Sequence, residues 1–269
     1  MTMKIPRIII PREHGAWAVL LVPALSAAIV TQSVSRDFFL LQLCTLMVFM
    51  STSPLHVILR EFSDTPPERA KYLQARFWSA AYLASAFVFI LPVLLHGHDR
   101  LIPIALLALA ALAGNYFLTE NSARTIPGDL AAVVGLTLTG PASYYVLTGA
   151  FDREAFILWV FNFLFFAYCI FYVHEKIKAA ATKKSALAFR EKLSLGRLLI
   201  GYQIFAAAIL VILFVGNVTP EYSLIAFVPM STQGIYGTLN LSGRVRFRNL
   251  GYALLFQALL FALLVGVLR

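Results

Sequence analysis

Residues 155–174 read AFILWVFNFLFFAYCIFYVH, a run without a single Lys, Arg, Asp or Glu. An α-helix of about 20 apolar residues crosses the hydrocarbon core of a bilayer, so this stretch predicts a transmembrane helix. Eight other stretches are also predominantly apolar, although Ser231, Thr232, Gln233 and Asn240 make one of them polar. The nine predicted spans are 15–32, 38–59, 77–96, 101–119, 128–149, 155–174, 194–215, 222–241 and 250–268.

The composition of the whole chain agrees with these spans. Hydrophobic residues make up 60% of the 269 residues and charged residues 13%, against about 45–50% and about 25% in soluble proteins. This excludes an ordinary soluble enzyme, a disordered chain and a disulfide-rich secreted scaffold. Cys44 and Cys169, the two cysteines, lie inside apolar runs and have no metal-ligand spacing. We therefore predict an all-α, polytopic membrane protein whose single transmembrane domain covers residues 1–269.

The basic residues predict the orientation of the spans. The net charge is +9, and in so hydrophobic a chain this favours a membrane surface over nucleic acid as the partner. With the N-terminus inside, 18 of the 22 Lys and Arg residues fall on inner segments, and Arg36, Arg100, Arg153 and Arg269 on outer ones. Because inner loops are enriched in Lys and Arg, we expect a cytoplasmic N-terminus and an external C-terminus in a cell inner membrane.

Ionisable residues at the inner ends of the spans are the candidate substrate-binding residues. Such side chains are costly near hydrocarbon unless they are paired or in water, and one shared wet cavity would solve this for all of them. The candidates, grouped by span end, are Arg12, Glu13 and His14; His56 and Arg60; Glu120, Arg124 and Asp129; and His174 and Lys178. We predict that they converge around one cytoplasm-facing cavity, with no metal site.

Each group has a predicted role. Arg60 and Lys178 would hold an anionic head group, because basic side chains bind phosphate and carboxylate groups. Glu120 and Asp129 would orient Arg124, and the histidines would donate hydrogen bonds or relay protons near neutral pH. The alternative is that these residues are independent anchors whose charges reach the head-group layer.

Four stretches of the sequence resemble a known family. They are PREHGAWAVLLVP at 11–23, SPLHVILR at 53–60, GDLAAVVGLTLTGPASYYVLTG at 128–149 and FNFLFFAYCIFYVHEKIK at 161–178. Together they resemble the YwiC-like family of bacterial inner-membrane proteins, whose activity is uncharacterised. The resemblance implies a membrane location and no mechanism.

A weaker resemblance is to the UbiA superfamily of intramembrane prenyltransferases. It consists of nine spans with the N-terminus inside, and of long inner loops after the second and sixth spans. The resemblance implies a UbiA-like bundle with Asp-rich motifs that hold Mg²⁺ on a prenyl diphosphate. Here those two places read Ser53–Arg60 and Val173–Lys178, where His, Arg and Lys replace the carboxylates, so the oxygen ligands that Mg²⁺ prefers are missing there.

Three functions agree with these observations. The first is binding or modifying an isoprenoid, a quinone or another lipid in an intramembrane cavity, by a transferase without the Asp motifs or by a binding protein. The second is an accessory role for a respiratory or cofactor-assembly complex, in which a protein partner docks on the basic inner face. The third is a small transporter whose path is lined by the polar span 222–241. The sequence assigns no catalytic residue and no cofactor.

Overall fold

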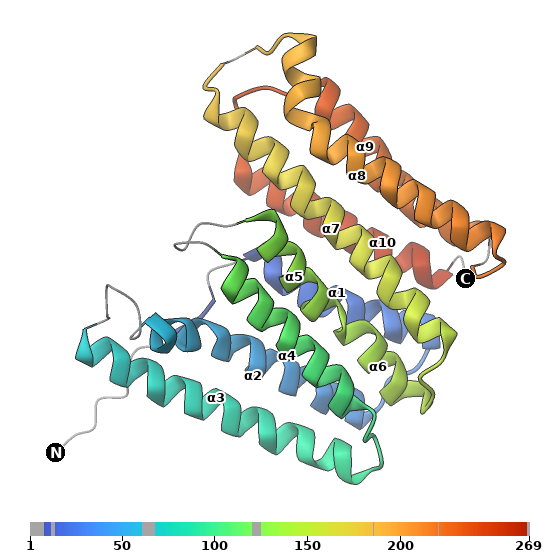
Figure 1. Cartoon of the computed structure of the whole chain (residues 1–269). Coiled ribbons are helices and arrows are strands. Elements are labelled where there is room, and N and C mark those ends of the chain that lie inside the picture. Colours follow the sequence, from blue (N-terminus) through green and yellow to red (C-terminus); the bar gives the residue numbers. More distant parts are fainter. Residues whose placement is uncertain are drawn as a thin grey trace.

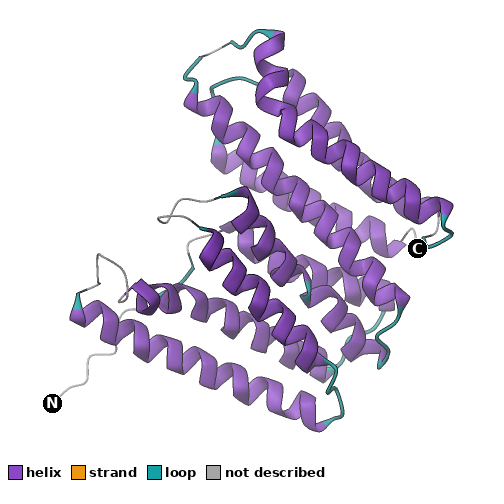
Figure 2. Ribbon diagram, viewed as in Figure 1, coloured by secondary structure: helices purple, strands orange, loops and turns teal. Residues whose placement is uncertain are grey.

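The computed structural model describes residues 8–11, 14–60, 68–119, 125–184, 186–219 and 221–267, apart from the side chains of residues 14 and 221–223. Within these ranges the chain forms helices joined by loops and no strand (Figure 2). The helices are α1 (His14–Thr31), α2 (Arg36–Leu59), α3 (Arg69–Leu95), α4 (Leu101–Leu118), α5 (Ile126–Thr137), α6 (Thr139–Thr148), α7 (Arg153–Ala181), α8 (Phe189–Val215), the 3₁₀ helix η3 (Glu221–Phe227), α9 (Val228–Leu239) and α10 (Phe247–Val267).

The predicted all-α, polytopic membrane fold is confirmed. Each of the nine predicted spans falls on helical residues, with α5 and α6 together forming the fifth. Among the described residues, seven spans are long and apolar enough to cross a membrane. The other two are the shorter apolar helix Gly15–Thr31 and the region of η3 and α9, where the polar stretch begins with a 3₁₀ helix and continues as a 12-residue α-helix.

The helices form a bundle with α2 and α3 at one edge and α8 and α9 at the other (Figure 1). Helices α1, α5, α6 and α7 lie between these edges. The most apolar window of α5–α6 is 72% buried, and that of α4 only 6%, although both are apolar enough to cross a membrane. The centre of the bundle is therefore α5–α6 with α1 and α7, whereas α4 presents most of its surface to the membrane.

The fifth span is broken between α5 and α6, at Leu138. Pro141 has no N–H to donate to the carbonyl of Thr137, and its ring crowds that carbonyl. At the break, the Thr139 hydroxyl donates to Leu20 O of α1 at 2.8 Å. The break therefore lies where α6 packs closely on α1.

Four helix termini lie at one side of the bundle (Figure 1). They are the ends of α2, α4 and α7 at Leu59, Leu118 and Ala181, and the start of α5 at Ile126. We call this side the inner end, following the predicted topology. It contains all the described candidate residues.

Candidate functional site

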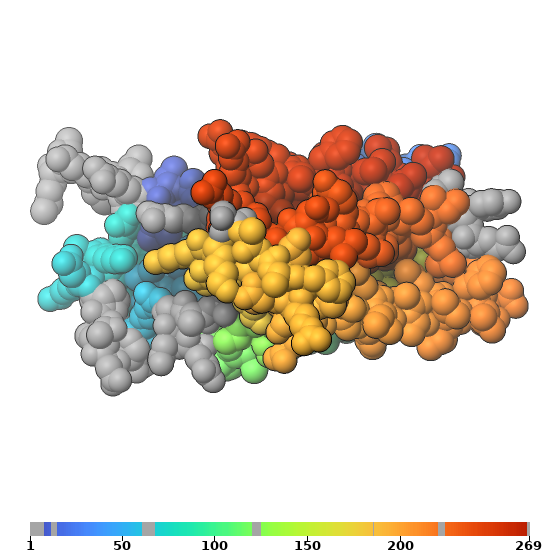
Figure 3. Space-filling model, turned by 90° about the horizontal axis from the view of Figure 1, so that it is seen from above, coloured from blue at the N-terminus to red at the C-terminus, as the bar shows by residue number. Residues whose placement is uncertain are grey.

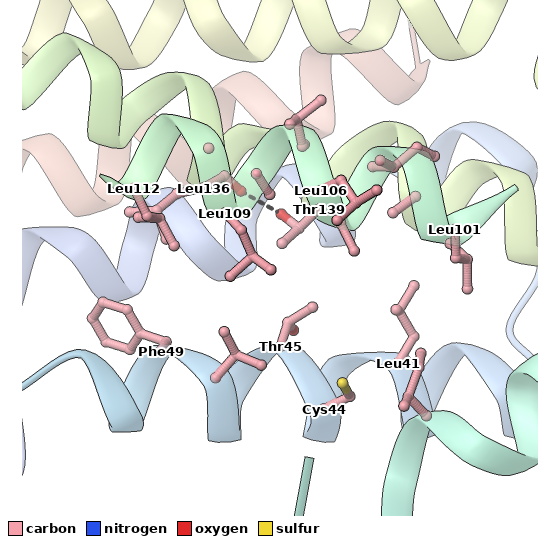
Figure 4. Close-up of a pocket in the computed structure, with 18 of the residues that line it drawn as sticks. Leu41, Cys44, Thr45, Phe49, Leu101, Leu106, Leu109, Leu112, Leu136 and Thr139 are labelled. Atoms are coloured by element: carbon pink, nitrogen blue, oxygen red, sulfur yellow. Dashed lines mark hydrogen bonds between the residues drawn. The ribbon is translucent and has the colours of Figure 1, made fainter. Parts of the chain in front are cut away.

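An apolar cavity of about 340 Å³ lies between α2 and α4 (Figure 4). Leucines of both helices line it, and Leu136 and Thr139 of the central span close its back. Leu106 and Leu109 of this lining are 62% and 53% exposed. The volume is at the lower end of the about 300–1,000 Å³ typical of ligand pockets.

The cavity exists because α2 and α4 pack mainly on other helices. α2 packs against α3, and α4 packs against α5. At the second contact, a Cβ on Gly135 would lie 3.0 Å from Ala108 O, so the missing side chain lets the α4 backbone sit directly on α5. Small residues thus allow α4 to pack closely on α5, whereas α2 packs on α3.

Aromatic and basic side chains lie beyond the cavity, at the inner ends of α2 and α4. His56 lies two turns beyond Phe49 on α2, and Tyr116 one turn beyond Leu112 on α4; both Phe49 and Leu112 line the cavity. The rings of His56 and Tyr116 are 5.4 Å apart between centroids. Arg60 follows His56 by one turn and is exposed. An imidazole, a phenol and a guanidinium therefore lie beyond the lining residues, at the inner ends of α2 and α4.

The α4–α5 corner beside these rings is held by polar contacts. The side chain of Asn115 donates to Gly128 O at 2.8 Å, and the Thr119 hydroxyl donates to Asn115 O at 2.7 Å. A Cβ on Gly128 would lie 3.0 Å from the Thr125 hydroxyl oxygen and 3.1 Å from that of Thr119. Only glycine leaves room for this tight corner, which positions the next residue, Asp129.

Asp129 reaches across to α7. Its Oδ2 lies 3.1 Å from Nε2 of His174, and both side chains are 18% exposed. Two predicted site residues from distant segments are thus in contact. A hydrogen bond to a carboxylate fixes the orientation of an imidazole ring. The contact accordingly ties the start of α5 to α7 at the inner end.

The other predicted site residues are placed as follows. His56 and Arg60 lie at the end of α2, and Lys178 is exposed one turn beyond His174. Arg12, Glu13, Glu120 and Arg124 lie outside the described residues, and of His14 only the backbone is described. The convergence of all ten around one cavity stays a prediction.

The sequence analysis missed two buried charges next to His174. Glu175 and Lys176 are 2% and 8% exposed, and Lys176 Nζ lies 3.4 Å from Glu175 Oε2. Lys176 Nζ also donates to Gly237 O at 2.7 Å, and the Thr238 hydroxyl donates to Glu175 Oε1 at 2.6 Å. Ionisable residues inside membranes are rare and usually functional, so this pair joins the candidates.

A signal for this pair was present in the sequence. Tyr168, Tyr172 and Glu175 follow one another at helical spacing and form a polar stripe on α7. The stripe faces the polar residues of α9, where Gln233 accepts a hydrogen bond from the Tyr168 hydroxyl at 3.2 Å. The polarity that made 222–241 unusual as a lipid-facing span is therefore partly explained by contacts with α7.

Comparison with known proteins identifies the family. The family model described as "YwiC-like protein" matches residues 10–144, half of the chain. This chain belongs to the YwiC-like family. The matched segment runs from the start of α1 into α6 and contains both walls of the cavity and the α4–α5 corner.

Two relatives extend the comparison of this YwiC-like chain. A Haemophilus influenzae protein described as "Uncharacterized protein" is 29% identical over 175 residues, 64% of this chain and 68% of the relative. "Uncharacterized protein YwiC" of Bacillus subtilis is 26% identical over 170 residues, 63% of this chain and 67% of the relative. No solved structure matches the chain, so the UbiA-like arrangement of the YwiC-like bundle stays a prediction.

Proposed function

We propose that the protein binds an isoprenoid or a comparable long-chain lipid, with its tail in the cavity between α2 and α4. The observation that carries this proposal is the apolar cavity itself, with the rings of His56 and Tyr116 further along the two helices that line it. A space lined by apolar side chains suits a hydrocarbon chain, because filling it restores the contacts that an empty space lacks.

The length of the cavity indicates how such a ligand lies. Its lining on α4 runs from Leu101 to Leu112, which at about 1.5 Å per residue is about 16 Å. This is close to half of the about 30 Å of hydrocarbon in a bilayer. The tail would then lie along the helices within one leaflet, with its head group at the inner interface.

The inner end suits an anionic head group. The guanidinium of Arg60 can bind a phosphate or carboxylate directly, with two parallel hydrogen bonds. His56, four residues earlier, lies on the same side of the helix and can add a third donor. We place the protein in a bacterial inner membrane with this end in the cytoplasm, since the basic segments gather there.

Native mass spectrometry of the protein extracted in mild detergent tests this proposal. We expect a bound prenyl lipid or quinone in the wild-type protein and its loss in Ala105→Trp, whose bulky side chain would fill the cavity from α4. Ala110→Trp is the matched control: Ala110 is also exposed, but it lies about 140° further around the helix.

The outcomes separate the candidate functions. A lipid retained equally by Ala105→Trp and Ala110→Trp would contradict the assigned cavity. A stable protein partner in place of a lipid would favour the accessory role, and uptake of a solute into reconstituted vesicles would favour transport.

A further inference from the structure

Two inner loops pack together away from the cavity. The loop after α7 and the loop after α9 lie side by side at the inner end (Figure 3). Gly243 N of the second loop donates to Lys184 O of the first at 2.9 Å. Leu187 and Leu241, one from each loop, are buried together with Ala179 of α7. The two loops therefore form one packed unit.

The outer surface of this unit is basic. We call it the basic cap and define it by six exposed side chains, which are Lys183, Lys184, Arg190, Arg244, Arg246 and Arg248. Residues 176–197 and 240–250 contain one acidic residue, Glu191, which pairs with Lys184. Packing of the loops thus concentrates positive charge that the sequence distributes over two distant segments.

Two exposed aromatic residues place the basic cap at the membrane surface. Phe189 is 62% exposed next to Arg190, and Phe247 is 47% exposed between Arg246 and Arg248. Both begin membrane-spanning helices, α8 and α10. Apolar aromatic rings beside cations are typical of the layer between hydrocarbon and head groups. At a lipid surface such rings enter the edge of the hydrocarbon while the neighbouring cations meet the head groups.

We infer that the basic cap binds the head groups of anionic phospholipids. The site lies on α7–α10 and does not depend on the proposed cavity ligand. Arginine and lysine on a rigid surface attract phosphate at close range, and anionic lipid at the cytoplasmic face is attracted by clusters of such residues. The basic cap therefore binds lipids with anionic head groups. The proposed cavity ligand is a different lipid, bound through its tail.

The test uses the full-length protein in nanodiscs of phosphatidylcholine with a minority of phosphatidylglycerol. Native mass spectrometry after gentle release counts the two lipids that stay bound. We expect phosphatidylglycerol to be enriched at least tenfold over its share in the disc, and this enrichment to fall when the salt concentration is raised. In Arg244→Gln/Arg246→Gln/Arg248→Gln we expect the enrichment to fall about tenfold or more.

The control removes the same number of charges from the opposite end of the bundle. Arg36→Gln/Arg100→Gln/Arg153→Gln should keep the enrichment within about twofold of wild type. An equal loss in both triple variants would overturn the inference, because it would show a response to net charge alone. So would unchanged enrichment in the cap variant, or an acidic protein bound to the cap in place of phosphatidylglycerol. The three arginines replaced in each variant are exposed. We therefore expect an unchanged helical circular dichroism spectrum for both triple variants.

Discussion

Oδ2 of Asp129 and Nε2 of His174 lie 3.1 Å apart, although 45 residues separate them along the chain. The contact joins α5, whose Leu136 lies at the back of the cavity, to α7 at the centre of the bundle. Each side chain is 18% exposed, so the pair is partly shielded from water. The buried charges Glu175 and Lys176 follow His174 directly on α7.

Removing either member of this pair should destabilise the fold. A hydrogen bond to a charged group contributes about 1.5–3 kcal/mol, so we expect Asp129→Ala and His174→Ala each to lower the unfolding free energy by about that amount. The double variant should lose less than the sum, because both single variants remove one shared interaction. Thermal unfolding in detergent measures this, with the exposed Lys178→Ala as a control near zero. Strictly additive losses would show that the two side chains do not interact.

Breaking the buried ion pair of Glu175 and Lys176 should lower the unfolding free energy more than breaking the Asp129–His174 contact. Removing one member of a buried ion pair costs about 3–5 kcal/mol, because the other charge is left uncompensated. We therefore expect Lys176→Met to unfold at much lower temperature than wild type, and Glu175→Gln/Lys176→Met to recover part of that loss. If the double variant were less stable than Lys176→Met, the charges would not be acting as a pair.

Two glycines of α8 offer a matched test of close packing at this pair. A Cβ on Gly196 would lie 2.6 Å from Glu175 Oε1, whereas a Cβ on Gly201 meets nothing within 4 Å. Gly196→Ala should be destabilising by about 1–3 kcal/mol, the cost of overpacking. Gly201→Ala should be neutral or stabilising by up to about 1 kcal/mol, because alanine favours a helix over glycine. Equal midpoints for the two variants in a thermal unfolding series would contradict the close contact of α7 with α8.

The distribution of Lys and Arg predicts where each loop lies. A reporter that is active only in the cytoplasm should be active when fused within residues 180–190, and one that is active only outside should be active after residue 269. The physical reason is that loops rich in Lys and Arg are retained on the cytoplasmic side. If both fusions reported the same side, the predicted number of spans would be wrong.

The sequence by itself determined the helices and the class of protein. A run such as 155–174 has no charge to keep it in water, and within a bilayer its backbone groups must bond to one another as a helix. This is a local property, so all nine predicted spans fall on helical residues. Even the polar character of 222–241 corresponds to a structural difference, namely the 3₁₀ turn and the short α9.

Only the tertiary structure decided which face of each helix is buried and what it meets. From the sequence we chose His174 and Lys178 on α7, yet Glu175 and Lys176 are the more deeply buried charges, because α9 packs there with Gly237 and Thr238. The cavity likewise depends on how closely α4 approaches α5 at Gly135. Hydropathy is summed along one segment, whereas burial depends on side-chain volumes contributed by distant segments, and that packing exists only in the assembled bundle.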